Sequence, residues 1–377
     1  MGPHQASKAL ELLFNAKQPV RLHGSPGVCE SQIVKQVAKK LGLELIDLRL
    51  SQLDSADLRG IPLVTGTAAS KSRKTDWATP KFLPTEGKGI LFLDEINSAA
   101  QATQAAAYQL VLDRKLGDYE LPEGWVVVAA GNRMQDRAIV NQMSSALKNR
   151  FSHIDFEVHF EDWIDWAFGA NIDDTIIAFL RFRKNFLNES ESHSGTTKEE
   201  KQRLQNLKDA KAFATPRSWE FFDRILKQEP DEELLPMLAA GTVGDAASVE
   251  YMAFKNLYRD LPTAEEILEK PEETRLPKQP SAHYAATTML ARHTTTKNWQ
   301  QAMKYIERLP GEYQVLFARD IVRNPANSNL CFQPEFMTWV RESKLIWPPS
   351  STRWPTRSTI SKSSTGGTSP WRHAKQP

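Results

Sequence analysis

The sequence has little cysteine and no long apolar segment. Cys29 and Cys331 are the only cysteines in 377 residues, so a disulfide framework is excluded, and neither has a neighbouring His/Cys cluster with metal-ligand spacing. No run of about 18 apolar residues occurs, so no membrane-spanning helix is predicted. The N-terminus lacks the charged start, apolar stretch and cleavage site of a signal peptide. We therefore expect a cytoplasmic protein with no membrane segment.

Acidic residues are missing from the C-terminal stretch, residues 350–377, which carries five Lys and Arg residues. The whole chain has a net charge of +2, so the remainder carries about −3. Nucleic-acid binding normally needs Lys and Arg clustered on a domain face, so the composition does not favour it. From residue 347 onward few apolar residues are available for a core, and we expect this basic tail, residues 347–377, to be disordered.

The first part of the chain alternates strand-like and helix-like segments. Apolar residues at helical spacing predict a helix over residues 31–41, and Gly42 is a plausible helix stop. Strands are predicted at residues 19–23, 44–50, 89–94, 125–130 and 153–158. Nearly continuous apolar strands are typical of a buried parallel sheet. We therefore predict an α/β fold with a nucleotide-binding core over residues 1–160.

Helical patterns replace strand patterns after residue 160. Amphipathic helices are predicted at residues 173–187, 216–226 and 234–257. They suggest an all-α lid over residues 161–262 with a polar insert at 188–211, followed by a helical extension over 263–346.

A glycine-containing loop lies between the first predicted strand and the first predicted helix. In this position a P-loop, G-x-x-x-x-G-K-[ST], binds phosphates with backbone N–H groups. The chain keeps Gly24, Gly27 and Ser31, but Cys29 replaces the second pattern glycine and Glu30 replaces the lysine. Alone, the loop is a weak signal. The candidate phosphate-binding residues are Gly24, Ser25, Pro26, Gly27, Val28, Cys29, Glu30 and Ser31.

Two adjacent carboxylates end the strand predicted at residues 89–94. Asp94 has the chemistry to hold Mg²⁺, and Glu95 can polarise an attacking water. An acidic helix cap after an ordinary strand is the alternative for this segment alone. Asn132 ends the next buried strand and could orient the same water. Arg150 precedes the last strand and Arg217 begins a predicted helix; taken singly, each arginine fits a surface position.

In this order the segments resemble those of the AAA+ ATPases, which have a P-loop NTPase core and an α-helical lid. Several phrases look most like the MoxR branch: DLRGIP, GDYELP, LFLDEIN, AAGNR, NRF and ATPRS. The resemblance covers about residues 10–262. It implies an ATPase with ATP and Mg²⁺ as ligands, in which Ser31 and Asp94 bind the metal and Glu95 activates water.

The resemblance also implies roles for the polar residues farther along the chain. Asn132 would position the water, and Arg217 would contact the nucleotide of its own subunit. Arg150 would reach the γ-phosphate of a neighbouring subunit, so the site would lie in a ring, commonly a hexamer. Such machines remodel or assemble client proteins, and MoxR-like proteins are often paired with a von Willebrand factor A domain protein.

The departures at Cys29 and Glu30 leave three interpretations open. The protein is an active ATPase that uses compensating cations such as Lys35 or Arg217, or a non-hydrolysing scaffold subunit that keeps the fold and acts by protein binding. In the third interpretation the loop sequence is a local alteration of an otherwise active family member.

Reversing a charge beside a polyanion changes the interaction energy by roughly 4 kcal/mol per charge pair at about 4 Å. We therefore expect weak or absent ATP binding.

Overall fold

The structure is a computed structural model, and it describes residues 1–24, 27, 30–65, 74–132, 148–189, 210–324, 327 and 329–342. The chain divides into two compact units. The α/β unit comprises Met1–His159, and the helical unit begins at Phe160. The basic tail and most of the polar insert lie outside the described residues.

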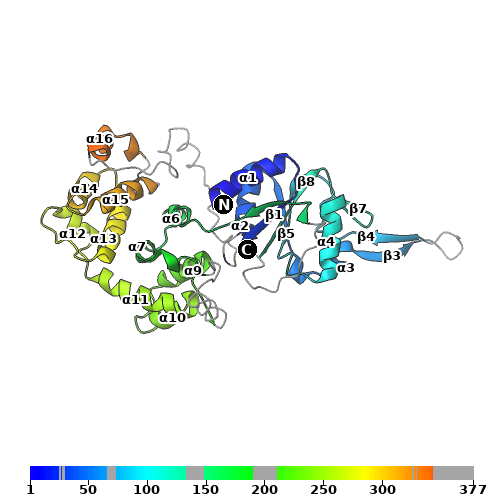
Figure 1. Ribbon diagram of the computed structural model, residues 1–377, viewed down its shortest axis with the longest axis horizontal. Coiled ribbons are helices and arrows are strands. Elements are labelled where there is room, and N and C mark those ends of the chain that lie inside the picture. Colours follow the sequence, from blue (N-terminus) through cyan, green and yellow to red (C-terminus); the bar gives the residue numbers. More distant parts are fainter. Residues whose placement is uncertain are drawn as a thin grey trace. The chain divides into compact units, whose positions relative to one another are not determined.

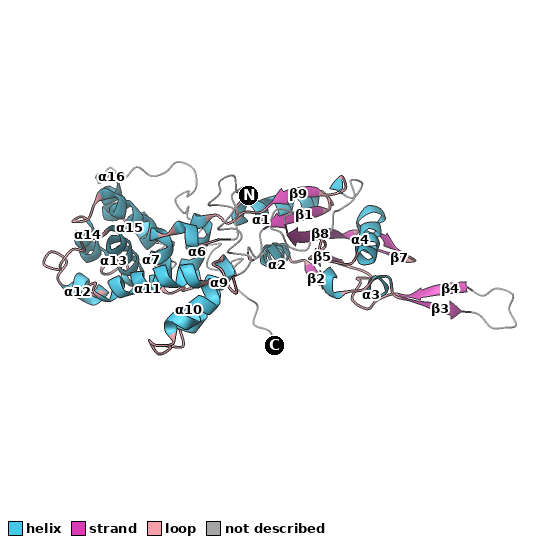
Figure 2. Ribbon diagram, turned by 60° about the horizontal axis from the view of Figure 1, so that its bottom comes forward, coloured by secondary structure: helices cyan, strands magenta, loops and turns pink. Residues whose placement is uncertain are grey.

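The α/β unit (Figure 1) is built on a five-stranded parallel sheet in the order β2-β5-β8-β1-β9, whose strands are labelled in Figure 2. Each predicted strand is confirmed with small shifts at its ends. The strands are β1 (Val20–Gly24), β2 (Glu44–Arg49), β5 (Lys88–Asp94), β8 (Gly124–Asn132) and β9 (Ser152–Asp155). Their interior residues are almost completely buried in β5 and β8, which explains the unbroken apolar runs in the sequence.

Helices cover both faces of this sheet. Val20 and Leu22 of β1 pack in one hydrophobic cluster with α1 (Pro3–Asn15) and α2 (Glu30–Leu41). The other face packs against α4 (Gln101–Asp113) in a second cluster. The predicted helix over 31–41 is confirmed as α2, and Gly42 follows it with φ +63°, a conformation that favours glycine. The predicted α/β class with a parallel sheet is therefore confirmed.

Short elements connect these layers. After β2 come a 3-10 turn, η1 (Leu50–Gln52), and α3 (Ser55–Arg59). A two-stranded hairpin of β3 (Ile61–Thr65) and β4 (Lys74–Ala78) then projects from the unit (Figure 2). A second small hairpin, β6 (Lys115–Leu116) with β7 (Tyr119–Glu120), precedes β8. Neither hairpin was predicted.

The helical unit has its own hydrophobic cores and no strand among its described residues. The predicted helix 216–226 is confirmed, whereas the single helix predicted over 234–257 is wrong, because Gly244 at φ +91° separates two helices. The helices are α6 (Phe160–Gly169), α7 (Asp174–Phe182), α9 (Pro216–Leu226), α10 (Leu235–Val243), α11 (Asp245–Arg259), α12 (Ala264–Glu269), α13 (Pro280–His293), α14 (Trp299–Ile306), α15 (Gly311–Arg323) and α16 (Pro334–Glu342), with 3-10 turns η3 (Lys184–Phe186) and η5 (Leu330–Phe332).

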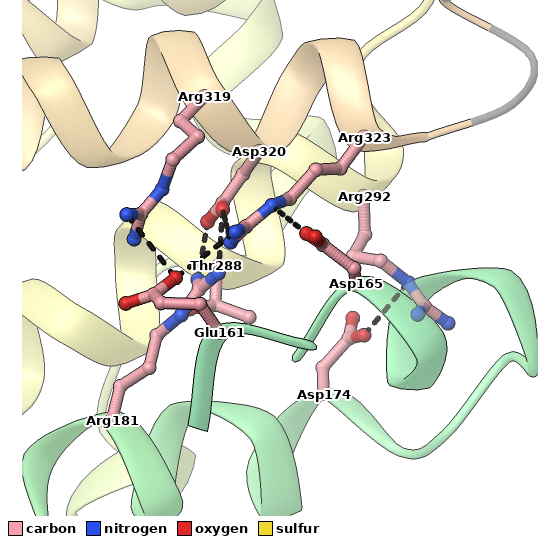
Figure 3. Close-up of polar contacts among 9 residues, drawn as sticks. All are labelled: Glu161, Asp165, Asp174, Arg181, Thr288, Arg292, Arg319, Asp320 and Arg323. Carbon is pink, nitrogen blue, oxygen red and sulfur yellow. Dashed lines mark hydrogen bonds and ion pairs between the residues drawn. The ribbon is translucent and has the colours of Figure 1, made fainter. Parts of the chain in front are cut away.

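A network of charged side chains joins four of these helices in the interior of the helical unit (Figure 3). Arg181 of α7 pairs with Asp320 of α15, and both side chains are almost wholly buried. The Arg181 Nη1 also donates to Thr288 Oγ1 of α13 at 2.8 Å. Glu161 of α6 receives Arg323 Nη2 at 2.9 Å. These pairs hold α6, α7, α13 and α15 together by directional contacts in addition to apolar packing.

Candidate active site

The register of the sheet places several of the predicted site residues at one edge. Gly24, the last residue of β1, lies opposite Asn132, the last residue of β8, and Asp94 at the end of β5 lies opposite Arg49 of β2. All these strands are parallel, so their carboxyl ends meet at this edge (Figure 1). The chain leaves β1 toward β2 on one side and leaves β8 toward β9 on the other. Ligands of open α/β sheets bind at such a switch point.

The predicted phosphate loop starts at this switch point. Gly24 ends β1, Gly27 has φ +85°, and α2 begins at Glu30, followed by Ser31. Ser25, Pro26, Val28 and Cys29 lie outside the described residues. The N-terminus of a helix as long as α2 offers backbone N–H groups and a positive dipole end to an anion. Glu30 is itself an acid in the first turn, where it stabilises the helix by about 0.3–1 kcal/mol without any ligand.

Asp94 ends β5, and Glu95 begins the turn that follows it. The Glu95 backbone N–H donates to Asp94 Oδ1 at 2.9 Å, and Glu95 has φ +55°, which a residue with a side chain rarely adopts. Burial raises the pKa of Asp94, and the charges of Asp47 and Glu95 add to this rise, while the Glu95 N–H and Arg49 act against it. A cation at this position would favour the ionised carboxylate and reverse the shift.

Ser51 of η1 contacts the second carboxylate. Its hydroxyl donates a hydrogen bond to Glu95 Oε2. The contact follows from strand order, because β2 is the neighbour of β5 and η1 follows β2 directly. Ser51 was not identified from the sequence, since nothing in the chain order shows that residues 44–52 lie beside residues 88–95.

The turn after Asp94 is tied to β8 by close packing. The Ile96 N–H donates to the carbonyl of Ala130 at 3.1 Å. Asn97 is buried and lies against Gly131, where an added Cβ would come within 1.7 Å of Asn97 Oδ1. Gly131 therefore provides the space that brings the carboxylate turn next to the end of β8. Asn132 follows at the edge of the sheet, and its side chain lies outside the description.

The two predicted arginines lie in different units. Arg150 is exposed in the turn before β9, and its carbonyl accepts from Gln18 Nε2 at 3.3 Å. Arg217 is the second residue of α9 in the helical unit, behind a capping box of Thr215 and Ser218. Lys35, a candidate compensating cation, pairs instead with Asp47 at 3.1 Å. The structure thus brings Gly24, Asp94 and Asn132 to one edge of the sheet.

The donor set fits Mg²⁺ held partly by phosphate. Among the residues that the structure describes, no three His, Cys, Asp or Glu side chains gather as a metal-binding group. Mg²⁺ commonly uses one or two carboxylates together with substrate phosphates and water. Asp94 and Ser31 supply a carboxylate and a hydroxyl of the required kind.

In the same described part of the chain, no helix is both long and apolar enough to cross a membrane.

In comparisons with known proteins, the segment that contains the parallel sheet matches a family model. Residues 20–160 match the family model AAA, described as the ATPase family associated with various cellular activities. No curated protein matches the chain. Among solved structures, the chain is similar to the RuvB Holliday junction branch migration motor of Thermotoga maritima, at 17% identity over 71% of this chain and 76% of that one, with a TM-score of 0.33.

The chain is also similar to NtrX from Brucella abortus in complex with ADP, at 13% identity over 90% of this chain and 67% of that one, with a TM-score of 0.36. Both structural likenesses are distant, and the family match is the stronger finding. It begins at Val20, the first residue of β1, and extends beyond β9, so it includes every strand of the parallel sheet. The α/β unit of this chain is therefore similar to the AAA family over residues 20–160.

Proposed function

We propose that the α/β unit binds ATP with Mg²⁺ and hydrolyses it to ADP and phosphate. The observation that carries this proposal is the register that puts Gly24, Asp94 and Asn132 at the carboxyl ends of adjoining parallel strands. A loop leading to a helix N-terminus, a carboxylate pair and the backbone of Asn132 then lie at one switch point.

Each side chain has a distinct task in this proposal. Asp94 and Ser31 hold Mg²⁺, which when bound neutralises charge on the phosphate oxygens. Glu95 accepts a proton from the attacking water, and its Ser51 contact fixes one carboxylate oxygen. Asn132 orients that water.

The proposed site is completed by neighbouring subunits of a ring, as in a MoxR-like hexamer. Arg150 is exposed, so its guanidinium is available to a site on another subunit. Arg217 would contact the nucleotide from the lid of its own subunit. Because turnover then needs an interface, oligomerisation is part of the mechanism.

We propose a protein client or a von Willebrand factor A domain partner for this machine. The β3–β4 hairpin supports a protein-binding role, because Ile61 and Val64 are 65% and 71% exposed. Apolar side chains on a projecting hairpin are suited to contacts with another protein. Loop and lid movements coupled to nucleotide state would transmit force to that partner.

Phosphate release from ATP and Mg²⁺ by the purified full chain tests this function. Glu95→Gln should abolish turnover and leave ATP affinity within about threefold, because it removes the base and keeps the shape. Arg150→Ala should also be inactive. A mixture of these two variants should regain turnover if each site uses Arg150 of a neighbour. Absence of phosphate release from the native chain would contradict the proposal.

A non-hydrolysing scaffold is the second candidate, and Glu30 at the lysine position favours it. An acid there repels phosphate, while it still stabilises the start of α2. A scaffold should assemble independently of nucleotide. Light scattering with and without ATP distinguishes the two functions, because an ATPase ring of the proposed kind should assemble more readily with ATP.

A further inference from the structure

Helix α10 carries apolar residues around most of its circumference. Its sequence is LPMLAAGTV, which contains no charged residue. A helix that is apolar on all sides is normally enclosed by other elements. Helix α10 instead lies at the margin of the helical unit, where it packs against α9 and α11 (Figure 1).

Two apolar stripes run along α10. The first is buried and has its residues at i, i+4 and i+8, namely Leu235, Ala239 and Val243. The second has its residues at i, i+3 and i+7, namely Leu234, Met237 and Gly241. Leu234 is 45% exposed and Met237 is 66% exposed, and a Cβ added at Gly241 would meet no atom within 4 Å. The second stripe thus has the spacing of a core-facing helix surface, although it is open to solvent.

Helix α11 extends this exposed stripe. The Ser248 hydroxyl donates to the carbonyl of Pro236 at 3.1 Å, which holds α11 against the first turn of α10. Val249, the next residue, is 70% exposed. Large apolar side chains that are exposed as a group mark interaction surfaces, whereas single ones are ordinary. We define the α10 face as four residues, Leu234, Met237, Gly241 and Val249.

The sequence around the α10 face is strongly acidic. Residues 226–250 contain six acids and a single base, Lys227. Lys227 pairs with Asp223 at 2.6 Å, so its charge is already engaged. Three exposed acids make no ion pair within the described part of the chain, namely Asp231, Glu233 and Asp245.

Two of these acids lie directly beside the apolar side chains. Glu233 precedes Leu234, and Asp245 lies four residues before Val249 on the same side of α11. The α10 face therefore combines an apolar centre with a negative rim. Such a rim disfavours an anionic membrane surface and favours a partner that carries Lys or Arg.

We propose that the α10 face binds an amphipathic helix of a protein partner, with an apolar stripe flanked by Lys and Arg. The apolar residues of that helix pack on Met237 and Val249, and its cations meet Glu233 and Asp245. Gly241 has no side chain, so the backbone of the partner helix can approach α10 closely there. A methionine suits this surface because its flexible side chain adapts to different apolar neighbours. The surface belongs to the helical unit and does not depend on the proposed nucleotide site.

Binding of a synthetic helical peptide to the full chain tests this proposal. The probe contains only Leu, Ala and Lys, with Leu at i, i+3, i+4 and i+7, and a control peptide has Glu at every Lys position. Methionine methyl groups labelled with ¹³C locate the contact, and Met237→Ala assigns one of the eight signals. The Lys peptide should shift the Met237 methyl signal saturably. By fluorescence anisotropy the Glu peptide should bind at least about tenfold more weakly, because its charges repel the rim.

Substitutions in the α10 face should weaken binding of the Lys peptide. Met237→Lys should do so at least about tenfold, because it replaces an apolar contact with a like charge. Leu12→Lys is the matched control, since Leu12 of α1 is 71% exposed in the other unit and the change in charge is the same. This control should bind within about twofold of the native chain at physiological salt. Native thermal midpoints are expected for both variants, because both side chains are exposed.

Two results would overturn the proposal directly. These are equal affinity of the Lys peptide for the native chain and Met237→Lys, and a peptide-induced shift that leaves the Met237 methyl signal unchanged. Neither measurement uses ATP, so absence of phosphate release would refute the proposed function alone.

Other occupants of the α10 face give different results, and each would also overturn the proposal. Self-association in sedimentation that Met237→Lys abolishes would assign the face to a second copy of the chain. Binding to phosphatidylcholine vesicles that Met237→Lys abolishes would assign it to a membrane. Peptide binding that appears only after removal of residues 347–377 would assign it to the basic tail.

Discussion

The hydroxyl of Ser51 donates a hydrogen bond to Glu95 Oε2, so the turn η1 that follows β2 holds the carboxylate that follows β5. Glu95 is also fixed by its backbone, which has φ +55°. A carboxylate that must accept a proton from water depends on its direction as well as its basicity. Ser51 is therefore expected to control hydrolysis without contacting nucleotide.

Ser51→Ala should lower ATP turnover about tenfold and leave ATP affinity unchanged. Loss of the hydroxyl frees Glu95 Oε2 to leave its position, and general-base catalysis contributes roughly 100- to 10,000-fold in total. Steady-state phosphate release with a parallel binding titration separates the two effects. Ser51→Thr keeps the hydroxyl and serves as the control. Equal turnover in Ser51→Ala and the native chain would show that the contact has no catalytic importance.

The stability of the helical unit should depend on the protonation of Asp174. Burial raises the pKa of Asp174 to about 6, although Arg292 Nε lies 3.0 Å away and opposes the rise. Because the unfolded pKa is about 4, the folded protein binds the proton first as the pH falls. The contribution of this group to the free energy of unfolding therefore increases as the pH falls from about 6 to about 4.

Asp174→Asn removes this titration. Urea unfolding at about pH 4.5 and 6.5 should show that the native chain gains stability relative to the variant at the lower pH, by up to about 2 kcal/mol. Other acids titrate in both proteins and cancel in the difference. Parallel pH profiles for the two proteins would mean that Asp174 titrates at its ordinary pKa.

Removing one partner of the Arg181–Asp320 pair should lower the free energy of unfolding strongly. Replacing both partners with apolar residues should lower it much less. Both side chains are shielded from water, so Asp320→Ala leaves Arg181 charged and buried (Figure 3). A loss of about 3–5 kcal/mol in the free energy of unfolding is expected. The double variant Arg181→Met with Asp320→Leu should recover most of it. Urea unfolding checks both, and additive losses in the double variant would contradict the expectation.

Much of the α/β unit could be predicted from the sequence, because its central strands β5 and β8 are buried on both faces and appear as unbroken apolar runs. The β3–β4 hairpin could not, since its strand residues are exposed and β3 contains Pro62. One predicted helix was wrong because Gly244 introduces a break that apolar spacing does not show.

Contacts between residues far apart in the sequence could not be predicted, for a different reason. Arg181 and Asp320 are 139 residues apart, and neither belongs to a local pattern. The contact of Ser51 likewise follows only from strand order, which decides that β2 adjoins β5. The candidate motifs were predicted because each is a short local pattern beside a strand or at the start of a helix.

The central claim is that the edge formed by Gly24, Asp94 and Asn132 is a nucleotide site weakened by Glu30. Its most direct test is ATP binding and phosphate release by the native chain and by Cys29→Gly with Glu30→Lys. The account predicts saturable ATP binding by the native chain, and at least about 100-fold tighter binding with faster turnover in the variant, a gain of about 3 kcal/mol. Equal affinity and turnover in the two proteins, or no binding by either, would contradict it.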